Sequence, residues 1–156
     1  MRTRHPLRAT FVLAMVVPLL AASCGGDDGT DNPTTPATTS GGGGGNDVSA
    51  ALEDFAIALD PDTVDAGDVH FEVTNNGPSV HEFVIFNTEF DEDSLPMDGA
   101  TVDENDAGIE VVDELEDLDA DTTTDLDVPL DAGSYVIICN VEGHYQSGMH
   151  TTLTVA

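Results

Sequence analysis

The sequence has almost no positive charge. Its 156 residues include 31 Asp and Glu but only three Lys and Arg, which gives a formal net charge of −28 at pH 7. All three are arginines, Arg2, Arg4 and Arg8, so nothing after them is cationic except histidine. Because phosphate contacts require Lys and Arg, we expect no nucleic-acid partner. An anionic membrane surface is excluded in the same way, unless the chain carries a lipid.

Tryptophan is absent, and cysteine occurs only twice, as Cys24 and Cys139. Two cysteines in an exported chain are compatible with one disulfide. We expect none here, because each cysteine has a better explanation in its own surroundings.

Residues 1–23 have the pattern of a signal peptide. The three arginines precede an apolar run over residues 9–20, which is too short to span a membrane and is followed by small residues. The stretch ending at Cys24 resembles a bacterial lipoprotein box, although Ala21 replaces the usual Leu three positions before the cysteine. We therefore expect export and lipidation of Cys24, with the protein anchored to the cell membrane in the periplasm or at the cell surface. The alternative is ordinary cleavage near Ser23 that leaves Cys24 as a free thiol.

Residues 24–46 form a low-complexity segment of Gly, Thr and Pro, which predicts a flexible tether. Residues 47–156 have the size of one β-sandwich domain. Asp68–Thr74 alternates strictly between apolar and polar residues, which predicts a half-buried strand. Residues 109–118 fit either a strand or a short helix, and the acidic residues 88–106 predict a long surface loop. Further strands are expected at 48–59, 81–86, 122–130, 133–138 and 150–155.

The residues best suited to chemistry lie in one loop, residues 139–149, between two predicted strands. Cys139, His144 and Met149 follow one another at intervals of five residues and supply a thiolate, an imidazole and a thioether. A trigonal site of two His and one Cys with a weak axial Met is typical of a blue-copper electron-transfer centre. The loop lacks the second His, and His81 is the best candidate because it begins a strand after an Asn-Gly turn. The simpler alternative for His81 is a hydrogen-bonded core residue.

These residues resemble the copper-binding segments of the cupredoxins, the type 1 blue copper proteins. The Cys-x₄-His-x₄-Met spacing is similar to that of the rusticyanin and sulfocyanin branch, and residues 75–85 are similar to the segment that carries the family's first His ligand. The resemblance extends over residues 48–156 and implies an all-β, Greek-key β-sandwich. It also implies one type 1 copper bound by His81, Cys139, His144 and Met149.

The chain departs from the family pattern at Glu142, where many relatives have Pro. Pro has no N–H, so Glu142 keeps a backbone donor near the sulfur. Hydrogen bonds to the thiolate tune the redox potential. The sequence does not show whether this donor points at the sulfur.

The resemblance implies a mononuclear copper protein that transfers single electrons at the outer face of the cell membrane. Its partner would be a redox protein such as a cationic cytochrome or a membrane oxidase. His144 would be the electron port, with Pro78 and Tyr145 on its rim. The alternative is an envelope copper carrier or buffer that uses the same ligands without electron transfer. We do not expect an enzyme, because the sequence has no second His cluster for a multicopper site and no convincing nucleophile–base pair.

Overall fold

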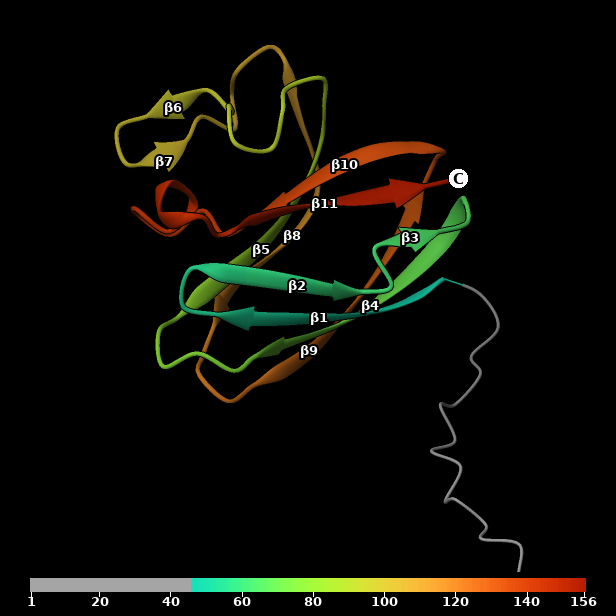
Figure 1. The fold of residues 1–156 in the computed structure, drawn as a ribbon, viewed down its shortest axis with the longest axis horizontal. Coiled ribbons are helices and arrows are strands. Elements are labelled where there is room, and N and C mark those ends of the chain that lie inside the picture. The colour runs from blue at the N-terminus through green and yellow to red at the C-terminus, as the bar shows by residue number, and fades with distance from the viewer. Residues whose placement is uncertain (1–45) are drawn as a thin grey trace, which may run out of the picture. The chain divides into compact units, whose positions relative to one another are not determined.

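The computed structural model describes residues 46–156, so the expectations for the signal peptide, for the tether up to residue 45 and for Cys24 lie outside the described residues. Residues 46–156 form an all-β structure of two main sheets, as expected (Figure 1). One sheet has the strand order β2-β1-β4-β9, the other β3-β11-β10-β5-β8, and β6 and β7 form a separate small hairpin. No helix in this range is long and apolar enough to cross a membrane. The strands are β1 (Asp47–Glu53), β2 (Ala56–Asp60), β3 (Thr63–Val64), β4 (Gly67–Asn75), β5 (His81–Thr88), β6 (Met97–Asp98), β7 (Thr101–Val102), β8 (Ile109–Leu118), β9 (Thr123–Leu130), β10 (Gly133–Ile138) and β11 (His150–Val155).

Strand β4 shows the alternation that its sequence predicts. Val69, Phe71 and Val73 are buried in the main core, while Glu72 on the opposite face is exposed. Phe71 packs against Phe83 of β5 in the other sheet, with ring centroids 5.4 Å apart. Burying a side chain of this size stabilises the fold by about 1.5–3 kcal/mol. The apolar faces of the two sheets therefore meet in one core.

Strands β5 and β10 are buried on both faces, which explains their continuous apolar sequences. Phe83 and Ile85 face the main core, whereas Val84 and Phe86 belong to a second apolar cluster. That cluster also contains Leu95, Val102 and Tyr145.

The acidic segment 88–106 was expected to be a plain surface loop, and this is wrong in part. It contains the β6–β7 hairpin, and its buried apolar residues anchor it to the outer face of the sheet.

Residues 109–118, whose sequence fits either a strand or a short helix, form strand β8. The strand pairs antiparallel with β5, and the register shifts at two places, between His81 and Phe83 and between Ile85 and Phe86. Each irregularity changes the face on which the following side chains lie. For this reason the apolar residues of β8 lose the simple period of two and acquire a spacing that resembles a helix.

Three connections lie at the same end of the sandwich, on the left in Figure 1. They are the β1–β2 turn, the β4–β5 loop and the β10–β11 loop, which contains the short 3₁₀-helix η1 (Tyr145–Ser147). Hydrogen bonds join two of them to neighbouring segments. The Asn76 N–H donates to the Leu52 carbonyl at 2.8 Å, and the Gly143 N–H donates to the Ala100 carbonyl at 2.9 Å. This end holds all four predicted site residues.

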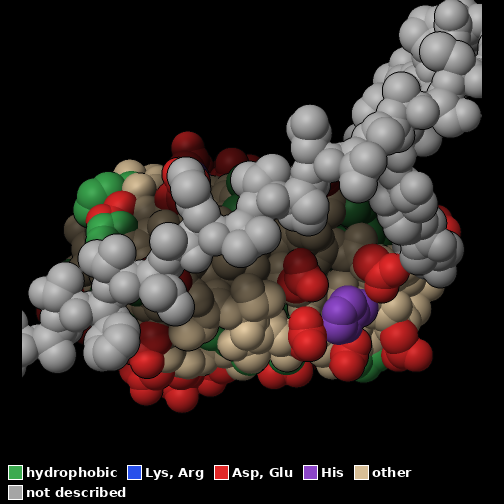
Figure 2. Space-filling model, turned by 90° about the horizontal axis from the view of Figure 1, so that it is seen from below, with side chains coloured by type: hydrophobic (Ala, Val, Ile, Leu, Met, Phe, Trp, Pro, Cys, Tyr) green, Lys and Arg blue, Asp and Glu red, His purple; other side chains and the backbone are tan. Residues whose placement is uncertain are grey.

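The surface of the described residues carries no Lys or Arg. Figure 2 shows Asp and Glu side chains along the edge of one face, with a histidine among them. His70 of β4 is partly exposed, and its Nδ1 lies 2.8 Å from Asp127 Oδ1. This hydrogen bond, together with the nearby carboxylates, raises the pKa of His70.

Candidate metal centre

Three predicted site residues come together from distant parts of the chain. His81 begins β5, Cys139 follows β10, and His144 lies just before η1. The His81 and His144 Nδ1 atoms are 3.2 Å apart, and Cys139 Sγ is 3.7 Å and 3.4 Å from them, respectively. One donor atom from each residue therefore lies within 4.8 Å of the other two. The arrangement offers two imidazole nitrogens and one sulfur to a common point.

Met149 is held next to these residues by the backbone of its own loop. It is fully buried, its N–H donates to the His144 carbonyl (3.1 Å), and its carbonyl accepts from the Cys139 N–H (3.1 Å). Gly148 precedes it with a φ of 104°, a left-handed conformation that only glycine adopts easily. The turn therefore places the thioether side chain in the core beside Cys139.

Cys139 is fully buried, and this burial raises the pKa of its thiol. Backbone hydrogen bonds from Glu82 and Val141 act in the opposite direction, and the Glu82 N–H lies 3.3 Å from Sγ. The exposed Glu142 makes no such contact with the sulfur among the described residues, so the extra N–H at this position is not the sulfur's donor. A bound metal ion removes the thiol proton outright.

His81 is also fully buried, and its two ring nitrogens have different surroundings. Nδ1 faces the sulfur and His144, while Nε2 lies 3.4 Å from Asp54 Oδ1. Burial lowers the pKa of His81, as does the nearby His144, and Asp54 partly opposes both effects. The neutral imidazole, which is the form that binds metals, is therefore favoured.

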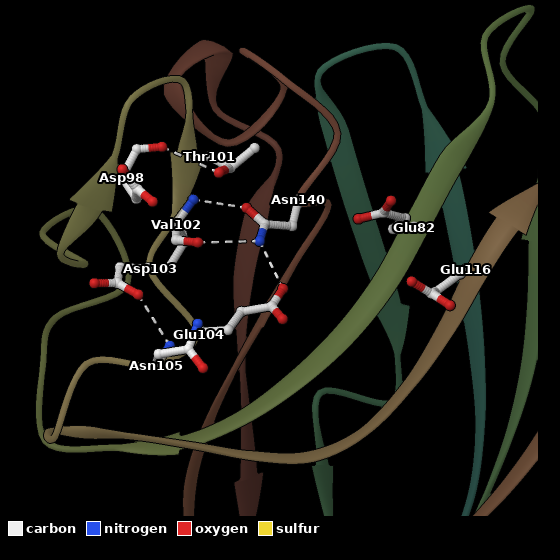
Figure 3. A pocket seen from close by; sticks show the side chains of 9 residues that line it. All are labelled: Glu82, Asp98, Thr101, Val102, Asp103, Glu104, Asn105, Glu116 and Asn140. Atoms are coloured by element: carbon white, nitrogen blue, oxygen red, sulfur yellow. Dashed lines mark hydrogen bonds between the residues drawn. The ribbon is translucent and has the colours of Figure 1, made fainter.

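Asn140, next to Cys139, joins the site to the β6–β7 hairpin (Figure 3). Its Oδ1 accepts from the Val102 N–H (2.7 Å), and its Nδ2 donates to the Val102 carbonyl (3.2 Å) and to Glu104 Oε1 (2.6 Å). The side chain thus pairs with Val102 as a strand neighbour would. No sequence pattern indicates this role of Asn140, because it depends on contacts between residues far apart in the chain.

A carboxylate-lined pocket of about 320 Å³ lies beside Asn140 (Figure 3). Burial raises the pKa of Glu82, and the charges of Glu104 and Glu116 raise it further. The backbone of Glu82 donates to the sulfur while its side chain lines this pocket. The charge of Glu82 in turn raises the pKa of the Cys139 thiol, as a smaller cause than burial. The carboxylates that line the pocket are Glu82, Asp98, Asp103, Glu104 and Glu116.

Tyr145, expected on an exposed rim around His144, is instead buried. Its hydroxyl accepts a hydrogen bond from the Leu95 N–H at 2.9 Å, so the residue anchors the acidic segment. The aromatic residue that does cover His144 is Phe55 in the β1–β2 turn, which is 50% exposed and has its ring centroid 5.6 Å from that of His144. Two-residue hairpin turns favour Gly, Asn and Asp, so a Phe in this turn is unusual. This was the sequence signal that could have identified Phe55 as a site residue.

Neither a family model nor a curated protein matches this chain. Solved structures do match it. Dithionite-reduced auracyanin from Roseiflexus castenholzii superposes with a TM-score of 0.53 at 19% identity, over 71% of this chain and 97% of that one. Rusticyanin from Thiobacillus ferrooxidans gives a TM-score of 0.53 at 20% identity, over 70% and 76%. Azurin from Methylomonas sp. strain J gives 0.53 at 16% identity, over 71% and 98%. The fold is the one that these cupredoxins share.

Proposed function

We propose that this chain, a protein with the cupredoxin fold, binds one type 1 copper ion and transfers single electrons. The observation that carries the proposal is the convergence of His81, Cys139 and His144, whose donor atoms lie within 4.8 Å of one another. Thiolate and imidazole are soft and borderline donors, and with a Met nearby they match the His₂Cys–Met set of blue-copper sites. The residues present therefore fit copper better than the oxygen-binding ions Mg²⁺ and Ca²⁺.

The chain's own residues suit the site to electron transfer. When bound, copper supplies a one-electron Cu(II)/Cu(I) couple. His81, Cys139 and His144 would hold the ion, and Met149 would be a fourth, weaker donor. Because β5 and β10 are packed on both faces, the ligands they carry have little freedom to move. A site that keeps one geometry in both oxidation states needs little rearrangement when an electron arrives or leaves.

His144 is the ligand best placed to meet a partner. It is partly exposed, whereas His81, Cys139 and Met149 are fully buried. An electron that passes between the metal position and the protein surface through His144 would cross only the imidazole of that residue. We propose a redox protein as the partner, such as a cationic cytochrome or a membrane oxidase. The acidic surface of this protein favours a partner whose contact surface is positively charged.

We also propose that the protein works at the outer face of the cell membrane, anchored by a lipid on Cys24. The support is the sequence pattern of residues 1–24, with three arginines, an apolar run and small residues before the cysteine. The wild-type protein should then occur in the membrane fraction and be released by detergent. Cys24→Ala should release it or leave it unprocessed. A wild-type protein found wholly in the medium, with an unmodified N-terminus, would rule the anchor out.

The copper proposal is tested by absorption and EPR spectra of the purified protein after addition of Cu(II). We expect an intense thiolate-to-copper charge-transfer band that Cys139→Ser abolishes. Cys24→Ser is the matched control, because it removes the other cysteine and should leave the band unchanged. A band that survives Cys139→Ser would contradict the site. A colourless protein that retains only Cu(I) would instead support a copper carrier or buffer.

A further inference from the structure

One two-residue turn contacts both histidines of the site from outside. Glu53 pairs with Ala56 to close the β1–β2 hairpin, which leaves Asp54 and Phe55 as the turn. Asp54 Oδ1 lies 3.4 Å from His81 Nε2, and the Phe55 ring stands edge-on to His144. Phe55 has a φ of 66°, so the turn adopts a backbone conformation that a bulky residue rarely takes.

The ring orientation of His81 makes Asp54 the natural partner of its outer nitrogen. Nδ1 faces Cys139 and His144, so a metal at their common point would use the Nδ1 lone pair. A neutral imidazole with a free Nδ1 lone pair carries its proton on Nε2. This Nε2 is buried and has no well-formed hydrogen bond among the described residues, and Asp54 Oδ1 is the acceptor beside it. A buried N–H without a partner is destabilising.

Gly77 provides the space for this contact. A Cβ at that position would lie 2.9 Å from both Asp54 Oδ1 and His81 Nε2, too close to either. Its N–H donates to Asn75 Oδ1 at 2.9 Å, which fixes the β4–β5 loop in this position. The loop therefore packs directly over the carboxylate–imidazole pair and leaves no room for a side chain.

We propose that Asp54 is a positioning residue for His81. Its carboxylate accepts the Nε2–H, fixes the tautomer that leaves Nδ1 free for the metal, and makes the imidazole a stronger donor. The present 3.4 Å is slightly longer than a typical N–H···O bond, and the partly exposed Asp54 side chain has room to shorten it. The identity of the metal rests on the proposed function, whereas the tautomer of His81 does not.

The tautomer is tested by NMR on the metal-free protein with ¹⁵N-labelled histidine, above the ordinary histidine pKa. In the wild type we expect His81 to carry its proton on Nε2, with a signal that exchanges slowly with water. Asp54→Ala should lose this protected signal, and Asp54→Asn should keep it, because the amide oxygen is still an acceptor. Gly77→Ala should weaken it by separating the pair. An unchanged signal in Asp54→Ala would overturn the proposal even if the wild type binds no copper.

The effect on the metal is tested by copper affinity and reduction potential. Loss of an outer carboxylate on a ligating histidine typically lowers metal affinity about 10–100-fold. A tenfold loss confined to Cu(II) corresponds to a potential about 59 mV higher for one electron. Glu53→Gln is the matched control, since it removes the same charge from the neighbouring residue without a contact to His81. Asp54→Ala removes the acceptor as well as the charge, so equal shifts in Asp54→Ala and Glu53→Gln would mean that Asp54 acts only through its charge, and would overturn the positioning role.

Discussion

Phe55 stands edge-on to the imidazole of His144, with ring centroids 5.6 Å apart and ring planes at 79°. The ring is held there by a backbone in the left-handed region, at a φ of 66°. Glycine would meet the needs of this turn without strain. Phe55 therefore shields the exposed side of His144, although its backbone conformation is unfavourable. We infer that Phe55 serves the site and not the stability of the turn.

The strain at Phe55 can be separated from the contact of its ring. Phe55→Ala and Phe55→Gly both remove the ring, but only alanine keeps a Cβ in the left-handed conformation. We expect Phe55→Gly to be more stable than Phe55→Ala by about 1 kcal/mol, the usual cost of that conformation. Urea unfolding of the metal-free protein measures the difference. Equal stability of the two variants would show that the turn relaxes without the ring.

A second prediction concerns the link between Asn140 and Val102. Asn140→Ala should lower the free energy of unfolding by about 2–3 kcal/mol, because it leaves the buried Val102 N–H and C=O without partners. Amide exchange at Val102 should become faster. Asn105→Ala, a change at an exposed residue of the same pocket, is the control and should stay within about 0.5 kcal/mol. Unchanged exchange at Val102 would mean that the hairpin is held by its apolar residues alone.

The sequence was sufficient to predict the parts of the structure that depend on local pattern. The alternation in β4 identified its buried face, and the spacing of Cys139, His144 and Met149 identified a loop that folds on itself. His81 required one further step, because only the fold brings it next to Cys139. Its position at the start of a strand, after an Asn-Gly turn, was enough for that step.

The remainder depended on contacts between distant segments. Asp54 and Asn140 are ordinary polar residues in the sequence, and they acquire roles only when the β1–β2 turn and the β6–β7 hairpin reach the site. Tyr145 was expected on the rim of His144 from the resemblance to the cupredoxins, but its hydroxyl accepts a hydrogen bond from the Leu95 N–H and its side chain is buried. The pattern of β8 was ambiguous because two register shifts interrupt its alternation.

A third prediction concerns Met149. Met149→Leu should keep copper bound and raise the reduction potential, because it removes a weak donor that favours Cu(II). The substitution preserves the volume of a buried side chain, so it should cost less than about 1.5 kcal/mol in stability. Met97→Leu, at a partly exposed methionine of β6, is the control and should leave the potential unchanged. Spectroelectrochemical titration measures both variants.

A fourth prediction follows from the crowded carboxylates. Burial, with the nearby acids adding to it, raises the pKa of Glu82 and of Glu114 above their ordinary value of 4.5. The folded state therefore binds more protons than the unfolded state between 4.5 and the raised values, and stability falls as pH rises through that window. The lowered pKa of His81 acts in the opposite sense at and below 6.5.

This pH dependence is measured by urea unfolding of the metal-free protein across mildly acidic pH. The double variant Glu82→Gln, Glu114→Gln should be more stable than the wild type near neutral pH, and its stability should decline less as pH rises. Glu53→Gln removes a carboxylate outside this cluster and serves as the control. The same decline in the double variant as in the wild type would place the responsible groups elsewhere.

The last prediction concerns how a partner meets the protein. The described surface carries many carboxylates and no Lys or Arg, so it attracts basic partners and repels acidic ones. Salt screens both effects beyond about 10 Å at 0.1 M. A basic cytochrome should therefore react more slowly as salt increases, and an acidic partner faster. Final contact should occur at His144 and Phe55. A contact made through carboxylates would require these groups to lose their bound water, which is unfavourable.

Phe55→Asp should then slow electron transfer at every salt concentration while leaving the blue spectrum nearly unchanged. Aspartate tolerates the left-handed backbone better than most residues, so the turn should persist. Phe90→Asp is the matched control, because Phe90 is 39% exposed and lies beside Gly108 rather than at His144. Both variants add the same charge, so only a contact role for Phe55 distinguishes them. Stopped-flow rates that respond equally to the two substitutions would leave charge as the sole determinant of the encounter and would remove Phe55 from the contact surface.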